Sequence, residues 1–192
     1  QERNQIHDAE IALTKDGRLL GVPDVFLHDS GAYDPYGLTV PLNSQCTLLG
    51  PYHIPNYYSE FIALFTNKTI VTPYRGAGRQ HGVFVIERFL DIAAKQLSID
   101  RTEIRRSNYI PPDKFPYNNE VIYQDFAPLT YDSGNYNPIM DKALELIGYE
   151  QFLKEEQPRL RAEGKHAGIG VVAYVEGTGI GLLLLLAFVL PP

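Results

Sequence analysis

TPYRGAGRQHG, residues 72–82, lies between a β-rich run and a segment whose apolar residues recur at the spacing of a helix. Gly76 and Gly78 stand one residue apart in it, so the backbone can approach a ligand closely and adopt conformations that a Cβ would bar. A helix that starts directly after them would aim unpaired N–H groups and a partial positive charge at the same place. Arg75 and Arg79 flank the glycines with guanidinium groups suited to an oxyanion. The stretch predicts an anion- or phosphate-binding loop before a helix.

Two common nucleotide-binding motifs do not fit this stretch. The dinucleotide fingerprint G-x-G-x-x-G, counted from Gly76, requires a third glycine where the chain has His81, and Gly82 comes one residue late. A P-loop requires Gly-Lys followed by Ser or Thr, which does not follow here. From the glycines alone, a tight loop with two surface arginines is the favoured alternative.

The segment from Gln80 to Leu97 predicts a long helix. Its apolar residues form two seams: Val83, Ile86, Leu90, Ala93 and Leu97, and then Val85, Phe89 and Ile92. Its polar stripe comprises Glu87, Arg88, Asp91 and Lys95. This stripe is only about 100° wide at the helical repeat, so the helix should be buried over most of its circumference. Asp91 and Lys95 are spaced for an ion pair one turn apart. So short a chain would cover such a helix poorly, and we expect it to be part of a larger protein.

The residues before this loop predict strands and irregular segments. An alternating strand at residues 9–13, an Asp-Gly turn at 14–17 and a return strand at 18–27 form a predicted hairpin. Pro23 in the return strand suggests an edge strand or a bulge, because proline has no N–H to donate. Residues 34–59 are rich in proline and tyrosine, and we interpret them as a long ordered loop or short strands.

The residues after the long helix predict more helices. Asp100 and Glu103 are spaced as a capping pair for a short helix through Arg106, and residues 111–130 are a Pro/Tyr/Asn-rich connection. Three later segments are predicted: a helix at residues 136–146, a helix at 150–163 and a buried strand at 168–176. Ser133 should cap the first of these helices and Gly148 should end it, and Pro158 should kink or break the second. The whole pattern predicts an α+β fold with mixed sheets and packed helices.

Two further groups of residues have a chemical and a structural interpretation. His28 and Asp29 suggest acid–base chemistry, but adjacent strand residues point to opposite faces, which favours a structural role. Five tyrosines could wall a pocket for an aromatic substrate: Tyr33, Tyr36, Tyr52, Tyr57 and Tyr58. Half-buried core residues with hydrated hydroxyls are the favoured interpretation of these tyrosines.

Composition excludes several function classes. The net charge of −6 and pI near 5.3 argue against nucleic acid and anionic membranes as partners. Cys46 is the only cysteine and the five histidines form no i,i+4 pair, so we expect no disulfide framework and no histidine- or cysteine-based metal site. No Gly-x-Ser-x-Gly elbow of a serine hydrolase occurs. The lone cysteine and the lack of a signal sequence suggest a cytoplasmic protein.

Nine motifs occur in the same order as in one known family. They are DSGAY (29–33), GPYHIPN (50–56), FTN (65–67), PYRGAGR (73–79), VIER (85–88), ID (99–100), IRRSNYI (104–110), YDSGNY (131–136) and YVEGTG (174–179). Over about residues 1–181 the chain therefore resembles the molybdopterin-binding large subunit of the molybdenum hydroxylases. This family includes xanthine dehydrogenases, aldehyde oxidases and aerobic carbon monoxide dehydrogenases.

The resemblance implies a cofactor and a reaction. Such enzymes use a molybdenum–molybdopterin cofactor, often a dinucleotide, to hydroxylate N-heteroaromatics or aldehydes with oxygen from water. Electrons leave through 2Fe-2S clusters to FAD on partner subunits or domains. By resemblance Arg75 lies beside the molybdenum–pterin unit, and Gly76, Ala77, Gly78 and Arg79 line it. Ala77 matches the position where xanthine dehydrogenases place a phenylalanine against the substrate.

The sequence also departs from parts of the family pattern. Gly76 stands where copper-type carbon monoxide dehydrogenases have a copper-binding cysteine, and Asn43 stands where xanthine dehydrogenases have a substrate-holding arginine. The family's glutamate base is expected outside this chain, and Glu176 does not match it. No catalytic residue is therefore assigned.

We expect residues 1–181 to be part of a molybdopterin-binding domain and residues 182–192 to be an anomalous apolar tail. Its nine apolar residues from Leu182 to Leu190 fall short of the roughly 20 that span a bilayer. A truncated or frame-shifted end is the preferred interpretation, and the chain alone is expected to be inactive. The alternative function is a catalytically inactive fragment that retains only subunit or phosphate binding.

Overall fold

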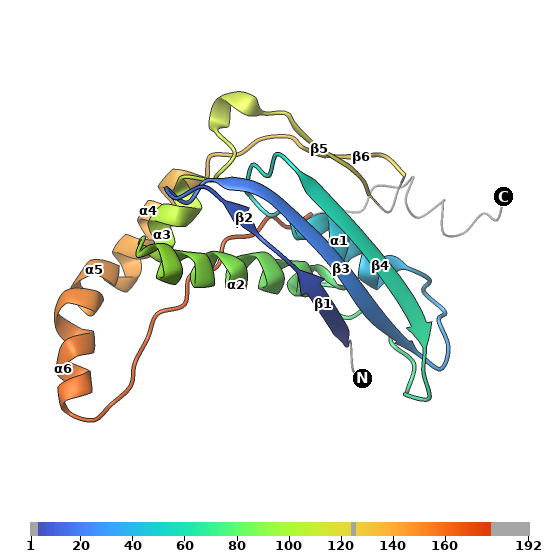
Figure 1. The fold of residues 1–192 in the computed structure, drawn as a ribbon, viewed down its shortest axis with the longest axis horizontal. Coiled ribbons are helices and arrows are strands. Elements are labelled where there is room, and N and C mark those ends of the chain that lie inside the picture. Colours follow the sequence, from blue (N-terminus) through green and yellow to red (C-terminus); the bar gives the residue numbers. More distant parts are fainter. Residues whose placement is uncertain (1–3, 124–125, 178–192) are drawn as a thin grey trace.

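A computed structural model describes residues 4–123 and 126–177, and its core is a four-stranded mixed sheet covered on one face by helices (Figure 1). The strands are β1 (Gln5–Ala9), β2 (Ala12–Leu13), β3 (Leu19–Gly31) and β4 (Tyr57–Phe65). The long strand β3 is central: β1 and β2 pair with it antiparallel, and β4 pairs with it in parallel. The predicted hairpin and the strand before the glycine loop are confirmed.

Pro23 lies in this central strand and not in an edge strand. It falls between the part of β3 that pairs with β1 and the part that pairs with β2. The neighbouring chain is interrupted there, at residues 10 and 11, so no ladder hydrogen bond from the proline nitrogen is required. The expectation of an edge strand is wrong, and an irregularity in the facing strand accommodates the proline.

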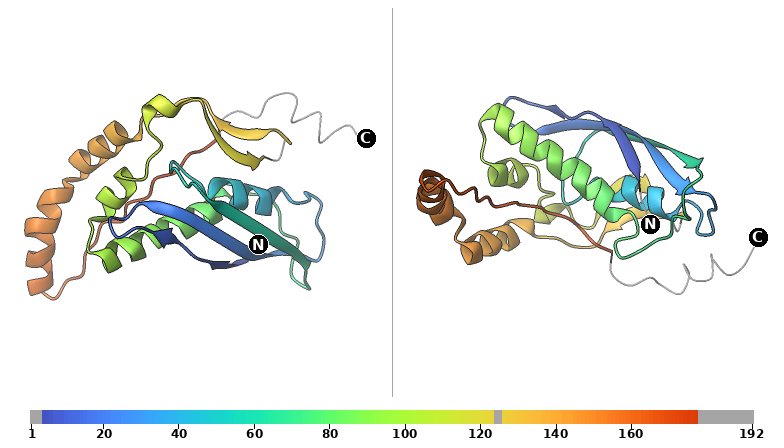
Figure 2. Two further views of the ribbon diagram at one scale, coloured as in Figure 1. Left: turned by 45° about the horizontal axis from the view of Figure 1, so that its top comes forward. Right: turned by 90° about the horizontal axis from the view of Figure 1, so that it is seen from below.

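Two helices pack against one face of the sheet (Figure 2). They are α1 (Thr39–Thr47) and α2 (Arg79–Leu97). The long helix α2 confirms the prediction, but α1 replaces part of the loop expected at residues 34–59. Pro41 lies in the first turn of α1, where proline is tolerated because that N–H has no helical partner. The two helices touch closely, since a Cβ on Gly82 would lie 2.2 Å from the Ser44 carbonyl oxygen.

A buried ion pair joins α2 to the short helix α3 (Arg101–Arg106). Arg105 is fully buried, its Nε donates to Glu87 Oε2 at 2.8 Å, and the Tyr52 hydroxyl donates to the same carboxylate. Burial raises the pKa of Glu87, and Arg105 opposes that shift. The prediction that Glu87 lies on an exposed polar stripe is therefore wrong. Asp91 contacts Arg105 at 3.0 Å and not the predicted Lys95.

The remaining elements lie in two places in Figure 1: a hairpin runs along the top of the view beyond β4, and further helices extend at the left end. They are η1 (Pro112–Lys114), the hairpin β5 (Tyr117–Ile122) and β6 (Pro128–Tyr131), then α4 (Tyr136–Ile147), α5 (Tyr149–Gln151), the π-helical η2 (Phe152–Glu156) and α6 (Gln157–Ala162). The hairpin lies within the expected connection. Asp100 caps α3 as predicted, but the N-cap of α4 is Asn135 and not Ser133. Gly148 ends α4 in a left-handed conformation, and the π-helical segment interrupts the helix just before Pro158.

The prediction of a strand at residues 168–176 is wrong. The segment forms no strand within the described part of the chain, although its exposure alternates along most of its length as in a strand. Val171 and Ala173 pack against the core, and Arg101 Nη1 donates to the Ile169 carbonyl at 2.8 Å. Residues 182–192 lie outside the described residues. The α+β class is confirmed, and none of the described helices is long and apolar enough to cross a membrane.

Candidate functional site: the glycine loop

The loop before α2 has three consecutive residues in the left-handed region. The φ angles are 92° at Gly76, 47° at Ala77 and 105° at Gly78. Glycine is required at position 78 for a second reason, because a Cβ there would lie 2.1 Å from the Val40 carbonyl oxygen of α1. The loop is thus pressed against α1, and the glycines allow both its curvature and that contact.

Part of the expected set of free N–H groups is used inside the loop. The N–H of Ala77 donates to the Tyr74 carbonyl at 2.6 Å, and that of Arg79 donates to the Gly76 carbonyl at 2.8 Å. Within residues 4–123 and 126–177, the N–H groups of Gly76 and Gly78 have no acceptor. Two N–H groups of the loop are therefore without an acceptor among the described residues, and those of Ala77 and Arg79 are used inside the loop.

Side chains of α1 hold the outer side of the loop. Asn43 Nδ2 donates to the Ala77 carbonyl at 2.9 Å, and Ser44 Oγ donates to the Gly78 carbonyl at 2.9 Å. Thr47 Oγ1 shares its one hydrogen between the Asn43 carbonyl at 2.6 Å and the Arg79 carbonyl at 3.2 Å. Sequence reasoning did not predict this contact with the loop, because it did not predict α1: it noted Asn43 only by its position in the family pattern and did not single out Ser44 or Thr47. The spacing of these three residues (i, i+1, i+4) would have grouped them on one helix face had the helix been recognised.

The two arginines of the loop have different environments. Arg79 is largely buried, its Nη2 donates to the Tyr123 hydroxyl at 2.6 Å and its Nε lies 3.3 Å from Glu176 Oε1. Arg75 is exposed and makes no ion pair or side-chain hydrogen bond to any described residue. Of the two guanidinium groups, that of Arg75 is available to an anion, whereas that of Arg79 ties the loop to the extended segment that contains Glu176.

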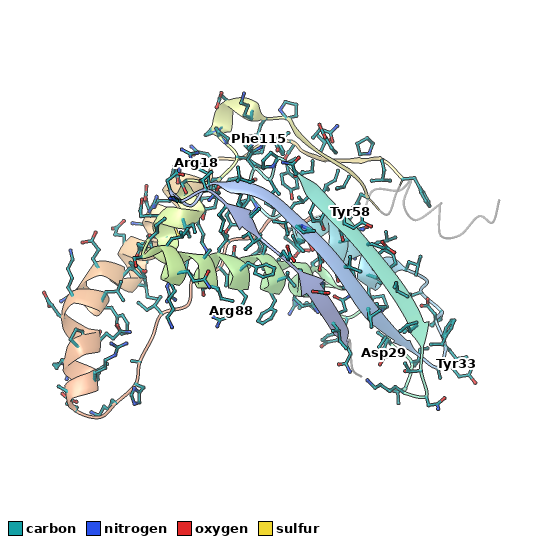
Figure 3. The ribbon with its side chains drawn as sticks, in the orientation of Figure 1. Arg18, Asp29, Tyr33, Tyr58, Arg88 and Phe115 are labelled. Atoms are coloured by element: carbon teal, nitrogen blue, oxygen red, sulfur yellow. The ribbon has the colours of Figure 1, made fainter. Side chains whose placement is uncertain are left out.

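A cleft of about 910 Å³ lies beside the loop and along α2. Its walls include Arg75, Gly76 and Arg79 from the loop, Val83, Phe84 and Arg88 from α2, and Val172, Tyr174 and Glu176 from the extended segment. Figure 3 shows Arg88 on α2. The carboxylates of Glu87, Asp91 and Glu176 also line the cleft, and each of them is paired with an arginine. Arg75 and Arg88 make no ion pair within the described residues, and these two cations together with the exposed rings of Phe84 and Tyr174 suit an anionic organic molecule with a planar part. Ala77 and Gly78 do not line this cleft.

The other candidate residues do not join this site. His28 is buried, whereas Asp29 contacts Lys68 at 2.8 Å, so the two side chains do not cooperate. Hydrogen bonds from Lys68 and Thr66 hold the pKa of Asp29 at about 2. The described residues contain no group of three acidic, histidine or cysteine side chains that could hold a metal ion.

The five tyrosines do not surround one pocket either. Tyr52 is buried against Glu87, and Tyr57 is half-buried. Tyr33 and Tyr58 are exposed at different ends of the sheet (Figure 3).

Known proteins resemble this chain over most of its length. The family model described as the molybdopterin cofactor-binding domain matches residues 1–109. The 6-hydroxypseudooxynicotine dehydrogenase complex subunit gamma of Paenarthrobacter nicotinovorans is 35% identical over 185 residues, which cover 94% of this chain and 22% of that protein. The carbon monoxide dehydrogenase large chain of Hydrogenophaga pseudoflava is 33% identical over 183 residues, covering 91% and 22%.

Solved structures share the fold. Quinoline 2-oxidoreductase from Pseudomonas putida 86 superposes with a TM-score of 0.75 and 32% identity, over 84% of this chain and 20% of that one. The chain spans about a fifth of the length of these relatives.

Proposed function

The chain belongs to the molybdopterin cofactor-binding domain family of molybdenum hydroxylase large subunits, and from this premise we propose that its glycine loop binds the molybdenum–molybdopterin cofactor of an oxidoreductase. When bound, that cofactor supplies the redox centre at which a substrate carbon is hydroxylated with oxygen from water. The residues of the chain bind and orient the cofactor.

Arg75 carries this proposal. Its guanidinium is exposed, has no partner within the described ranges and lies at the mouth of the cleft beside α2. The free N–H groups of Gly76 and Gly78 lie in the same loop. A charged fork of donors together with backbone N–H groups suits an anionic cofactor. Arg79 holds the loop through Tyr123 and Glu176 as well as lining the site.

We further propose that Ala77 contacts the substrate and that the substrate is an N-heteroaromatic or an aldehyde. A methyl group at this position leaves room for a planar ring. The names of two relatives, 6-hydroxypseudooxynicotine dehydrogenase and quinoline 2-oxidoreductase, support an N-heteroaromatic substrate. Gly76 offers no thiolate for copper, which argues against carbon monoxide.

The partners in this proposal are iron–sulfur and flavin subunits of a cytoplasmic enzyme, with a dinucleotide form of the pterin. One relative is named as the gamma subunit of a dehydrogenase complex, which supports a multi-subunit assembly.

Substitution of Arg75 tests the proposal in the full-length protein with its partner subunits. Arg75→Ala should reduce molybdenum content or oxidation rate by well over tenfold, because a charge-assisted hydrogen bond to a buried anion contributes about 1.5–3 kcal/mol. Arg75→Lys should retain part of the function, since it keeps the charge but not the fork. Arg161→Ala, which removes another exposed arginine without a described partner, is the matched control. Full metal occupancy and normal turnover in Arg75→Ala would contradict the assignment.

A further inference from the structure

A chain of polar side chains connects the sheet to the carbonyl of Gly78. Asp24 on β3 is fully buried, and its Oδ1 lies 2.9 Å from His7 Nδ1 on β1. His7 Nε2 lies 3.0 Å from Gln5 Oε1. Gln5 Nε2 donates to Ser44 Oγ at 2.9 Å, and Ser44 Oγ lies 2.9 Å from the Gly78 carbonyl oxygen. The chain thus runs from the middle of the sheet to the loop that the proposed function uses.

Hydrogen-bond chemistry fixes the direction of this chain. The Ser44 hydroxyl has one hydrogen, which is shared between the Gly78 carbonyl and a carbonyl one turn back in α1, so its oxygen accepts from Gln5. The Gln5 carbonyl oxygen then faces His7 Nε2, and because that oxygen can only accept, Nε2 carries a hydrogen. The contact between His7 Nδ1 and Asp24 holds a second proton, since a carboxylate and a bare ring nitrogen would both be acceptors.

His28 supports the same orientation of the Gln5 amide. Its Nδ1 lies 3.3 Å from Gln5 Nε2. Burial, together with His81, lowers the pKa of His28, which favours the neutral ring whose Nδ1 can accept. The amide nitrogen of Gln5 therefore faces two acceptors, and its oxygen faces one donor.

We propose that His7 and Asp24 are positioning residues for the glycine loop, acting through Gln5 and Ser44 on the Gly78 carbonyl. This proposal rests on the proposed function, because the hydrogen-bonded series of side chains ends at the loop that would hold the cofactor. Such a hold matters because Ala77, a residue with a Cβ, has a φ of 47° and needs surrounding contacts to keep it there. The Gly78 carbonyl oxygen also accepts from the backbone N–H of His81 and lies 3.0 Å from His81 Nδ1. The hydrogen-bond series through Ser44 therefore adjusts the loop and is not its only support.

Two substitutions test the chain at different links. Gln5→Glu keeps the shape of the side chain and still accepts from His7, but its second oxygen cannot donate to Ser44. The Ser44 hydrogen would then turn to the new carboxylate and leave the Gly78 carbonyl. Ser44→Ala removes the last link directly. Ser59→Ala is the control, because Ser59 Oγ is buried and has no hydrogen-bond partner among the described residues.

The opening of the loop is measured by hydrogen exchange of peptides that cover residues 72–82, followed by mass spectrometry in the full-length protein. Gln5→Glu and Ser44→Ala should each raise exchange by about three- to tenfold, the effect of losing one hydrogen bond, and Ser59→Ala should not. His7→Asn keeps a donor near the position of His7 Nδ1 for Asp24 but removes the contact with Gln5, and combined with Ser44→Ala it should add nothing to Ser44→Ala alone. General destabilisation of the fold would not give that result, because independent effects add.

The outcomes separate this inference from the proposed function. Unchanged exchange in Gln5→Glu, or additive effects of His7→Asn and Ser44→Ala, would overturn the positioning role. If exchange responds as expected while molybdenum content stays unchanged in every loop variant, Arg75→Ala included, the positioning role stands and the cofactor assignment fails.

Discussion

Replacing Arg105 with alanine should leave Glu87 as an unpaired carboxylate inside the protein. Arg105 is fully buried, and its guanidinium contacts Glu87 Oε2 at 2.8 Å and Asp91 Oδ1 at 3.0 Å. Removing one member of a buried ion pair costs about 3–5 kcal/mol, because the remaining charge keeps its desolvation penalty. Native domains are stable by about 5–15 kcal/mol in total. The variant should therefore lose a large part of the stability of this domain.

The loss should also depend on pH. Burial raises the pKa of Glu87 above its ordinary value of 4.5, and Arg105 opposes that shift, so removing Arg105 raises the pKa further. A carboxyl whose pKa is higher in the folded state makes the folded protein bind more protons than the unfolded chain. Stability then falls as the pH rises from the unfolded pKa through the folded one. Above pH 4.5 the stability of Arg105→Ala should fall more steeply than that of the unaltered protein.

The stability of this domain is measured by urea unfolding of the full-length protein, with hydrogen exchange of α2 peptides as the readout of unfolding. With a urea slope of about 2 kcal/mol/M, the midpoint should fall by roughly 2 M. The matched control is Arg106→Ala on the same helix, whose partners Glu103 and Asp141 are mostly exposed. Such a surface pair contributes about 0–1 kcal/mol.

A second variant separates lost charge pairing from lost packing. Glu87→Gln combined with Arg105→Met removes both charges and keeps most of the volume, so it should recover much of the loss. Equal midpoints for Arg105→Ala and Arg106→Ala, or an Arg105→Ala stability that rises with pH above 4.5, would refute the reasoning.

Two further predictions concern the loop and the metal. Gly78→Ala should add roughly 1–3 kcal/mol of steric cost to the backbone strain, because its Cβ would lie 2.1 Å from the Val40 carbonyl oxygen. Gly37→Ala, also at positive φ but with nothing within 4 Å, is its control, and equal thermal midpoints for the two variants would contradict this. Elemental analysis of the intact enzyme should find molybdenum without stoichiometric copper, since Gly76 supplies no thiolate. One copper per molybdenum would refute that expectation.

The sequence predicted secondary structure best where apolar residues recur at a helical spacing over many residues. The helix predicted at residues 80–97 begins one residue earlier in the structure. Periodicity revealed it because Ile86, Leu90 and Ala93 of the first apolar seam are buried in the core, whereas Ile92 of the second seam is exposed. The helix α1 was missed because its buried face includes Asn43 and Ser44, polar residues that face the glycine loop. Helical apolar periodicity cannot reveal a helix whose contacts are hydrogen bonds.

Partners distant in sequence explain the other errors. Glu87 is a polar residue on the apolar face of α2, and its burial depends on the ion pair with Arg105, which lies eighteen positions later in the sequence. The link between His7 and Asp24 depends on strand register, which local sequence does not specify. Residues 168–176 have the alternation of a strand, but a strand exists only where a neighbour pairs with it, and none does so in the described part of the chain.

The hydrogen bonds from α1 to the glycine loop make the shape of the loop independent of the side chain at position 77, because Asn43, Ser44 and Thr47 bind backbone carbonyls. Under the proposed function, a change of that side chain would alter the contact with the substrate without moving the backbone that would hold the cofactor. The positive φ at Ala77 sets the limit on such a change, because unbranched side chains tolerate it better than β-branched ones.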